Sequence, residues 1–240
     1  MDTELTPMPM VLMYHSVEPY DSDPFQLTVE PRRFNEQLRW LHGRGLRGVS
    51  VAELLRARHA GGGHGLVGLT FDDGYTDFVT HVLPALDRYG FTATVFVIAG
   101  ALGGHNWWDE PAPRKQLMTA AHVLTAVDAG MEIGSHSLTH RRLTELDEEV
   151  LAHELTRSRA ELSALIGGGV TGFCYPYGAA GEREVAAVKA AGYDYACHVR
   201  PAPIAGRHAM PRTYIGDKDN APRLYAKWAR HRLVGSRGAR

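Results

Sequence analysis

The sequence is poor in the features that mark several specialised classes of protein. Only two cysteines, Cys174 and Cys197, occur among the 240 residues, and their spacing matches neither a zinc finger nor a redox pair. A disulfide between them is possible, but nothing in the sequence requires one. The simplest interpretation treats both as small buried hydrophobic residues.

Charge of one sign and long hydrophobic runs are also missing. The formal net charge is -1, which favours neither nucleic acid nor an anionic membrane as a partner. No apolar run approaches the roughly 18 residues of a membrane span. Residues 1–4 carry no positive charge, and the apolar run Met8–Met13 is too short for a signal peptide. As written, the sequence predicts a cytoplasmic protein without an obligate protein partner; removal of a leader would imply a secreted or cell-surface protein instead.

What remains is an ordinary globular composition, with 44% hydrophobic and 22% charged residues. We expect one domain over residues 1–240 with a core of roughly 10–215, because α/β barrels commonly have this length. Short strand-like runs alternate with helical patterns along the chain. The predicted strands are 11–14, 46–49, 66–71, 92–98, 131–135, 170–175, 193–199 and 210–215.

The predicted helices fill most of the intervals between these strands. They cover 31–42, the stretch after Ser50, 81–89, 119–129, 146–166, 182–191 and 222–233. This alternation predicts an α/β fold with a parallel sheet, either closed as a barrel or open and doubly wound. Both architectures place the active site at the carboxyl ends of the strands.

Polar side chains follow several of these strands directly. Asp72 and Asp73 end the run Leu66–Phe71, and His136 and His140 follow the run 131–135. A separation of four would place the two imidazoles on one face of a helical turn. With one carboxylate they would form a three-ligand site that suits zinc, iron(II) or another divalent transition metal and leaves a position open for water.

The two adjacent aspartates are expected to have different roles. Neighbouring residues leave a strand in different directions, so one can bind the metal while the other faces the substrate as a general base towards a metal-bound water. A glycosidase would need two carboxyl groups on opposite sides of a glycosidic bond, about 5 to 10 Å apart. An adjacent pair is a poor starting point for that arrangement.

Three motifs in this order resemble the polysaccharide deacetylases of carbohydrate esterase family 4. They are Thr70-Phe71-Asp72-Asp73-Gly74, His136-Ser137-Leu138-Thr139-His140 and Tyr175-Pro176-Tyr177-Gly178. The resemblance implies a distorted (β/α)7-type barrel. It also implies removal of acetyl groups from N-acetylated sugars such as chitin, peptidoglycan or poly-N-acetylglucosamine.

Carried over by position, the resemblance makes Asp73, His136 and His140 the ligands of one divalent metal, zinc first, with cobalt or nickel as alternatives. Asp72 would be the base. The backbone N–H of Tyr177 would help to hold the oxyanion, and Pro176 would lie beside it at the substrate.

The sequence departs from the family pattern in two places. Cys174 stands where the third motif usually has arginine, and the late Leu-x-His motif is replaced by Met210-Pro211-Arg212-Thr213-Tyr214. His15, after the run 11–14, resembles the histidine that acts as the acid in the subgroup that deacetylates exopolysaccharide.

Three further residues are candidates for substrate contact. Arg212 either forms an ion pair beneath the site or lies at a strand edge, and it could also touch the substrate. Trp107 and Trp108 could provide a platform on which a sugar ring stacks, since flat apolar sugar faces favour aromatic partners.

Two other functions fit the same residues less well. One is a cytoplasmic hydrolase of a small amide or cyclic imide on the same fold. The other is a metal-free carbohydrate-binding module descended from an enzyme. The presence of Asp73, His136 and His140 argues against this second alternative.

Overall fold

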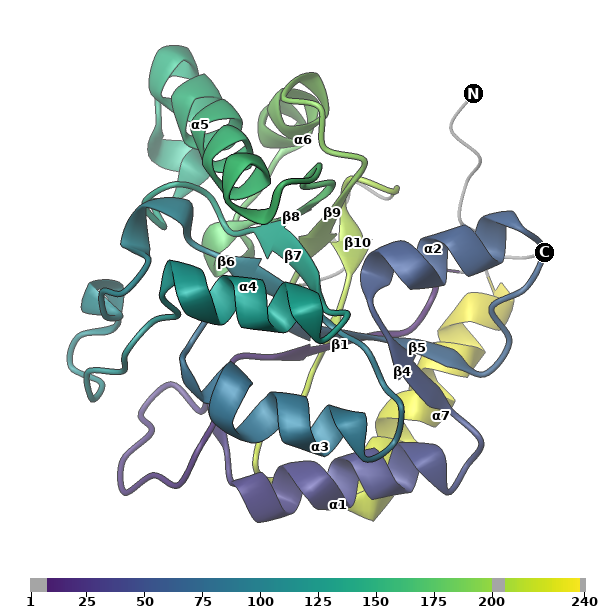
Figure 1. Cartoon of the computed structure of the whole chain (residues 1–240). Helices are drawn as coiled ribbons and strands as arrows, with labels where there is room; N and C mark the ends of the chain where they lie inside the picture. Colours follow the sequence, from purple (N-terminus) through teal and green to yellow (C-terminus); the bar gives the residue numbers. More distant parts are fainter. Residues whose placement is uncertain (1–7, 200–205, 238–240) are drawn as a thin grey trace.

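A parallel sheet forms the centre of the molecule, and helices surround it (Figure 1). The computed structural model describes residues 8–199 and 206–237; the expectation for residues 1–4 lies outside them. Among the described residues, nine strands make one sheet, and β2 (Ser16–Val17) with β3 (Thr28–Val29) make a separate pair. The sheet consists of β1 (Val11–Tyr14), β4 (Arg47–Val49), β5 (Leu66–Phe71), β6 (Thr94–Val97), β7 (Glu132–Ser135), β8 (Gly172–Cys174), β9 (Tyr195–His198), β10 (Met210–Pro211) and β11 (Thr213–Tyr214).

One short segment joins the two ends of this sheet. β10 pairs with β9, while β11, one residue later, pairs with β1 at the other end of the strand order. All of these pairings are parallel, so the sheet is nearly closed into a barrel. The predicted (β/α)7-type fold is therefore confirmed. Arg212, the residue at which the segment changes partner, lies between the two strands.

The helices cover the outside of the sheet (Figure 1). They are α1 (Pro31–His42), α2 (Val51–His59), α3 (Leu83–Asp87), α4 (Ala120–Asp128), α5 (Glu148–Ile166), α6 (Glu182–Ala190) and α7 (Ala221–Arg237). α5 ends at Gly167 in the left-handed conformation, which suits glycine at this position. The Ser50 hydroxyl accepts the Glu53 N–H and so caps α2.

The structure changes several of the predicted bounds. The helix expected over 81–89 begins earlier, as a π-helical turn, Phe78–Val82, that continues into α3. The strand expected over 210–215 is broken at Arg212, because its two halves pair with opposite ends of the sheet. The loop expected over 99–114 contains two 3₁₀ turns, η2 (Ala99–Ala101) and η3 (Trp107–Asp109).

An aromatic cluster packs directly beneath two of the candidate site residues. Tyr14 and Phe71 end β1 and β5 and stack with ring centroids 5.2 Å apart. Phe34 of α1 and Phe78 meet them edge-on. All four are fully buried, and each aromatic of this size contributes about 1.5 to 3 kcal/mol through burial. The cluster therefore fixes the strand ends from which the next residues, His15 and Asp72, project.

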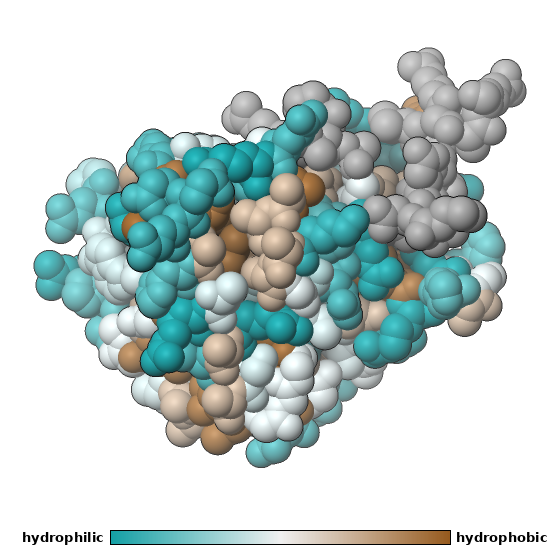
Figure 2. Space-filling model, turned by 90° about the horizontal axis from the view of Figure 1, so that it is seen from above, coloured by the Kyte–Doolittle hydropathy of each residue, from teal (hydrophilic) through white to brown (hydrophobic). Residues whose placement is uncertain are grey.

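The outer surface shows no sign of a membrane-spanning helix. Within the described residues, none of the helices combines the length and the apolar character needed to cross a bilayer. Figure 2 shows the face over α5 and α6, where hydrophilic residues dominate and hydrophobic ones occur in small separate areas. Both cysteines are buried and free, as the sequence predicted.

Candidate metal centre

The turn after β5 points two buried carboxylates in different directions. The Asp72 N–H still donates to the Tyr14 carbonyl at 3.0 Å, so Asp72 continues the strand pairing. Asp73 then takes a left-handed conformation with φ 70°, and so does Gly74. A Cβ at Gly74 would lie 3.3 Å from a methyl group of Val97, so glycine suits this position both in its backbone conformation and in its close contact.

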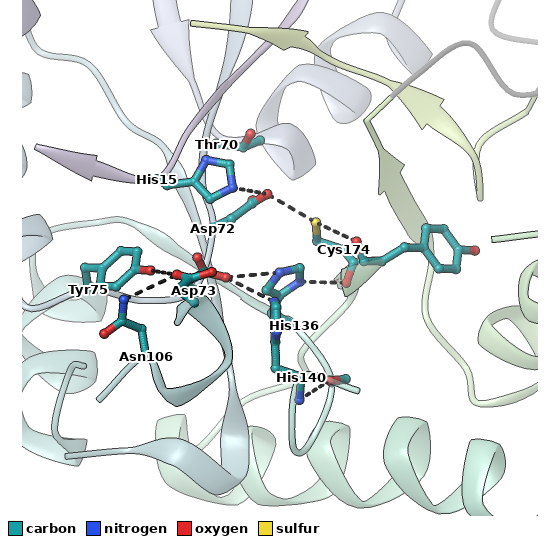
Figure 3. A network of polar contacts seen from close by, with 12 residues as sticks. His15, Thr70, Asp72, Asp73, Tyr75, Asn106, His136, His140 and Cys174 are labelled. Atoms are coloured by element: carbon teal, nitrogen blue, oxygen red, sulfur yellow. Dashed lines mark hydrogen bonds and ion pairs between the residues drawn. The ribbon is translucent and has the colours of Figure 1, made fainter. Parts of the chain in front are cut away.

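Asp73 meets the two histidines. One of its carboxylate oxygens, Oδ1, lies 3.3 Å from Nε2 of His136 and 3.4 Å from Nε2 of His140. One ligand atom from each of the three residues lies within 4.8 Å of the others, and all three side chains are buried. Figure 3 shows Asp73 and His136 facing one another, with His140 on the loop beyond.

The hydrogen bonding of His136 leaves the correct nitrogen for a metal. Its Nδ1 lies 2.8 Å from the backbone carbonyl of Cys174. Since a carbonyl only accepts, Nδ1 carries a hydrogen, so in the neutral imidazole Nε2 keeps the lone pair. Metal-binding histidines are commonly oriented by such a bond from their other nitrogen.

Electrostatics also favour a cation among these three residues. Burial alone would raise the pKa of Asp73, but hydrogen bonding with His136 and His140 holds it well below its usual range. Burial lowers the pKa of His140, which favours the neutral form that binds a metal.

The spacing of the donor atoms fits a metal ion as well. Two ligand atoms about 2.1 Å from a common ion at tetrahedral angles lie about 3.4 Å apart. The Asp73 oxygen and each imidazole nitrogen are separated by nearly this distance. The three residues can therefore hold a divalent metal.

His136 and His140 do not share a helical turn, so that part of the sequence-based expectation is wrong. The segment between them is an irregular loop in which Ser137 and His140 have φ of 69° and 58°. Its backbone N–H groups are satisfied by side chains: Leu138 and Thr139 donate to Glu154 Oε2, each at 2.9 Å, and His140 donates to Ser137 Oγ at 3.0 Å. The imidazoles converge because this loop folds back on itself.

Two residues that the sequence did not single out hold this loop. Glu154 is buried on α5, within the face that carries the leucines, and its carboxylate also accepts the Thr139 hydroxyl. On the other side, the Gly100 N–H donates to the Leu138 carbonyl at 2.8 Å. A Cβ at Gly100 would lie only 2.7 Å from that oxygen, so a larger residue would displace the loop.

Asp72 has a different partner, Arg212. The guanidinium donates to both carboxylate oxygens, at 2.6 and 2.7 Å, and also to Cys174 Sγ at 3.0 Å. Arg212 therefore supplies the guanidinium partner of Asp72, although position 174, where the family motif usually has arginine, carries cysteine. Its side chain is fully buried, so the ion-pair alternative describes its position, and it does not line an open surface as a substrate contact would.

This ion pair sets the charge of Asp72. Burial alone would raise the pKa of the Asp72 carboxyl, but the charge and hydrogen bonds of Arg212 outweigh burial and lower it. Asp72 is therefore ionised at neutral pH. The bidentate contact also fixes the orientation of the carboxylate.

His15 lies on the far side of Asp72 from Cys174 (Figure 3). Its Nε2 is 3.8 Å from Asp72 Oδ2, and its side chain is 14% exposed. Its buried Nδ1 has no hydrogen-bond partner among the described residues. The imidazole is thus close to Asp72 and can reach a bound molecule.

Tyr177 brings a backbone N–H to the same region. Its φ of 59° is left-handed, within the 3₁₀ turn Pro176–Gly178 (η5). The next two N–H groups donate to carbonyls within this turn, whereas no described acceptor takes the Tyr177 N–H. Pro176 is buried, while the Tyr177 ring is 46% exposed and lies 4.7 Å from the His140 ring.

Strained backbone is concentrated at this site. Five described residues other than glycine have positive φ, and all except Gln26 belong to the turns just described: Asp73, Ser137, His140 and Tyr177. Such conformations cost about 1 to 3 kcal/mol each and cluster at functional sites. Their concentration here supports a functional role for this end of the barrel.

A family model described as polysaccharide deacetylase matches residues 60–196, more than half of the chain. The chain belongs to the polysaccharide deacetylase family. YxkH of Bacillus subtilis (strain 168), a protein named for the same family, is 27% identical over 210 residues, covering 85% of this chain and 70% of that protein. The poly-beta-1,6-N-acetyl-D-glucosamine N-deacetylase of Escherichia coli (strain K12) is 34% identical over 109 residues, covering 44% of this chain and 15% of that protein.

Solved structures of similar proteins support the fold. The Streptococcus pyogenes deacetylase PplD has a TM-score of 0.79 at 21% identity, with 92% of this chain and 98% of that chain covered. IcaB from Ammonifex degensii has a TM-score of 0.74 at 22% identity, covering 91% and 96%. At this level of identity the likeness concerns the barrel itself.

Two tryptophans complete the surroundings of the site in this member of the deacetylase family. Trp108 stacks on the His140 ring at 4.3 Å with an interplanar angle of 30°, so it packs against a candidate metal ligand. Trp107 meets Trp108 edge-on at 4.9 Å and is 46% exposed. Of the two, Trp107 has the free surface that a sugar ring needs for stacking.

Proposed function

We propose that this protein is a metal-dependent hydrolase that removes acetyl groups from an N-acetylated amino sugar within an oligo- or polysaccharide. The observation that carries this proposal is the convergence of Asp73, His136 and His140 at one end of the barrel, directly beside an ionised Asp72. Membership of the polysaccharide deacetylase family supports the reaction class. The relative from Escherichia coli, named for poly-beta-1,6-N-acetyl-D-glucosamine, supports the substrate class.

Asp73, His136 and His140 would hold one divalent ion, with zinc as the first candidate and cobalt and nickel as alternatives. Such an ion polarises a carbonyl oxygen and makes a coordinated water more acidic. Glu154 and the Cys174 carbonyl keep the histidines in position for it.

Asp72 would act as the general base. As the oxygen of the attacking water forms a bond to the amide carbon, a proton passes from that water to the Asp72 carboxylate. Arg212 keeps this carboxylate ionised and aimed. It donates no proton itself, because a guanidinium stays charged in proteins.

The remaining steps would use Tyr177 and His15. The N–H of Tyr177, which no described acceptor takes, could donate to the oxyanion that forms when the carbonyl is attacked. Such a hydrogen bond typically stabilises the transition state by a few kcal/mol. The C–N bond then breaks, and His15 in its protonated form supplies a proton to the departing nitrogen. The products are acetate and a free amine. Trp107, Trp108 and Pro176 would contact the sugar ring.

The decisive experiment measures acetate release from N-acetylglucosamine oligomers. The protein is stripped of metal with a chelator and then reloaded with zinc, cobalt or nickel. We expect release only from reloaded protein. Turnover of small amides or cyclic imides, with none of the sugars, would favour the alternative hydrolase. Failure to take up any divalent metal would favour a carbohydrate-binding module and would refute the proposal.

The role of His15 needs its own test. His15→Ala should lower kcat by about 10²- to 10⁴-fold, the usual contribution of a general acid, while zinc affinity stays the same. His64→Ala, in the loop between α2 and β5 at the opposite end of the barrel, is the matched control. Near wild-type kcat in fully loaded His15→Ala would show that another group protonates the amine.

A further inference from the structure

A third carboxylate, which the mechanism above does not use, lies beside the metal centre. Asp109 ends the turn η3 that also carries Trp107 and Trp108. Trp108, the preceding residue, stacks on the His140 ring. Asp109 is half-buried; burial raises its pKa, and the nearby negative charge of Asp73 raises it further.

The structure fixes one oxygen of this carboxylate and leaves the other available. Oδ2 accepts the Tyr75 hydroxyl at 3.0 Å and the Asn106 amide at 3.3 Å. Asn106 is itself held, because its Oδ1 accepts the Lys115 N–H at 2.7 Å. Oδ1 of Asp109 has no hydrogen bond from any described residue. Figure 3 shows Tyr75 and Asn106 on the flank of Asp73 that faces away from Cys174.

Two common explanations for a carboxylate in such a place do not apply here. Among the described residues, none of the lysines, arginines or histidines forms an ion pair with Asp109. It also lies outside the two clusters of closely spaced metal-ligand atoms found in the described chain, Asp73–His136–His140 and Asp72–His136–Cys174. Asp109 therefore has one carboxylate oxygen, Oδ1, without a partner among the described residues, on a side chain held close enough to Asp73 and His140 to feel their charges.

The neighbours of Asp109 indicate what it would accept. Trp107 and Tyr177 are each 46% exposed, and they provide apolar aromatic surface close to the metal centre. Aromatic rings take the apolar face of a sugar, and ionised carboxylates accept strong hydrogen bonds from hydroxyl groups. A simple N-acetylated alkylamine offers the reacting amide without any such hydroxyl.

We propose that Asp109 binds a hydroxyl group of the sugar unit whose acetamide reacts, and that this contact makes the enzyme specific for hydroxyl-bearing amino sugars. The inference rests on the proposed deacetylase function and adds a specificity-determining residue to it. A site built to pair with a hydroxyl discriminates strongly against analogues that lack it, because its own polar group is then left unpaired.

The test combines variants of Asp109 with modified substrates. Wild-type protein, Asp109→Ala and Asp109→Asn are compared on an N-acetylglucosamine oligomer and on its 3-, 4- and 6-deoxy analogues at the reacting unit. In the wild type, one deoxy analogue should lose about 10- to 100-fold in kcat/KM, the usual worth of a hydrogen bond to a charged group. Asp109→Ala should lose a similar factor on the parent oligomer and show no further loss on that analogue.

Controls separate this contact from a structural role. Zinc stoichiometry and thermal midpoint are measured for each variant, and Asp109→Asn, which keeps the shape, serves if Asp109→Ala does not fold. Asp128→Asn, the same change at the exposed end of α4, should match the wild type on every substrate.

The outcomes are distinguishable from one another. One outcome overturns the inference although the wild type deacetylates the oligomer. In it, the fall in kcat/KM caused by Asp109→Ala and the fall caused by each deoxy analogue multiply when the two are combined, which means that Asp109 contacts none of these hydroxyl groups. The same conclusion follows if the Asp109 variants behave as the wild type. Absence of acetate release by metal-loaded wild type would instead refute the proposed function on which the inference rests.

Discussion

Asp72 and Asp73 are adjacent, chemically identical and equally buried, with 3% of each exposed, yet the barrel gives them opposite surroundings. Asp72 faces a guanidinium from the segment that closes the sheet. Asp73 faces two imidazoles from the loop after β7. The left-handed φ of Asp73 turns the second carboxylate away from the first, so the bidentate ion pair forms at Asp72 and the contacts with both imidazole Nε2 atoms form at Asp73.

The two proposed roles therefore rest on the partners of each carboxylate rather than on the residue type. A guanidinium stays charged and has no lone pair to offer a metal, so its pairing with Asp72 suits the proposed role of Asp72 as an ionised, oriented base. Imidazole nitrogens with lone pairs can share a metal with a carboxylate, which is why Asp73 is the proposed ligand. The predictions below test separately the residues around Asp73 (the Asp73 side) and the residues around Asp72 (the Asp72 side).

The largest effect is expected on the Asp73 side. His136→Ala removes one of three ligands and also leaves the Cys174 carbonyl without its donor. We expect loss of detectable zinc binding in calorimetry and a fall of acetate release to the level of metal-stripped wild type. Zinc binding with wild-type affinity in this variant would place the metal elsewhere.

On the Asp72 side, Arg212→Met should leave zinc affinity intact but lower kcat by about 10²- to 10⁴-fold, because the base loses its charge partner and orientation. The variant should also lose about 3 to 5 kcal/mol in the free energy of unfolding, since it leaves a buried carboxylate unpaired. Urea denaturation and steady-state kinetics measure both effects.

Two variants serve as checks on this prediction. Arg39→Met, on the exposed face of α1, should match the wild type. Adding Asp72→Asn to Arg212→Met should restore much of the stability but not the activity. A double variant as unstable as Arg212→Met alone would show that the ion pair is not the cause.

A smaller effect should come from the support of the histidine loop. Glu154→Gln loses the charged acceptor of two backbone N–H groups, so we expect zinc affinity to fall by about 10- to 100-fold, as for other residues that orient metal ligands. Glu149→Gln, an exposed position on the same helix, should leave zinc affinity unchanged. Equal zinc affinity in both variants would show that the loop holds the histidines without Glu154.

The smallest effect concerns Asp77, which neither side uses. Burial raises its pKa to about 6, although Ser16 and the Val17 N–H donate to it. The folded protein therefore holds the Asp77 proton more tightly than the unfolded chain does, and this proton stabilises the folded state. The stabilisation is fully present below the ordinary pKa of 3.8 and is lost as pH rises through about 6. The shift corresponds to about 3 kcal/mol.

Asp77→Asn should remove this dependence without changing zinc affinity. The free energy of unfolding of wild type minus that of the variant should therefore decrease between pH 4 and pH 7. A constant difference over this range would mean that Asp77 titrates alike in the folded and unfolded states.

Short-range pattern was sufficient for much of the fold and part of the site. The alternation of apolar strands with helices predicted the parallel sheet, because each element buries a face that its own sequence marks. Asp72, Asp73, His136 and His140 could be named because each follows a strand within a few residues, and parallel strands end at a common edge. The exact path of the histidine loop was predicted wrongly, since a separation of four fits a helical turn as well as a folded loop.

Tertiary structure alone decided which side chains complete the site. Arg212 reaches Asp72 because residues 210–214 close the barrel, a contact across 140 positions of sequence that no local pattern encodes. Glu154 lies among leucines on its helix, so the sequence gives no sign that its carboxylate holds the histidine loop. Asp109 follows two tryptophans in a loop, and only the folded chain brings Tyr75 and Asn106 to its carboxylate. Local sequence was enough to name the groups that could do chemistry at the strand ends. Long-range packing chose their partners, because charge and orientation depend on neighbours that the chain supplies from far away.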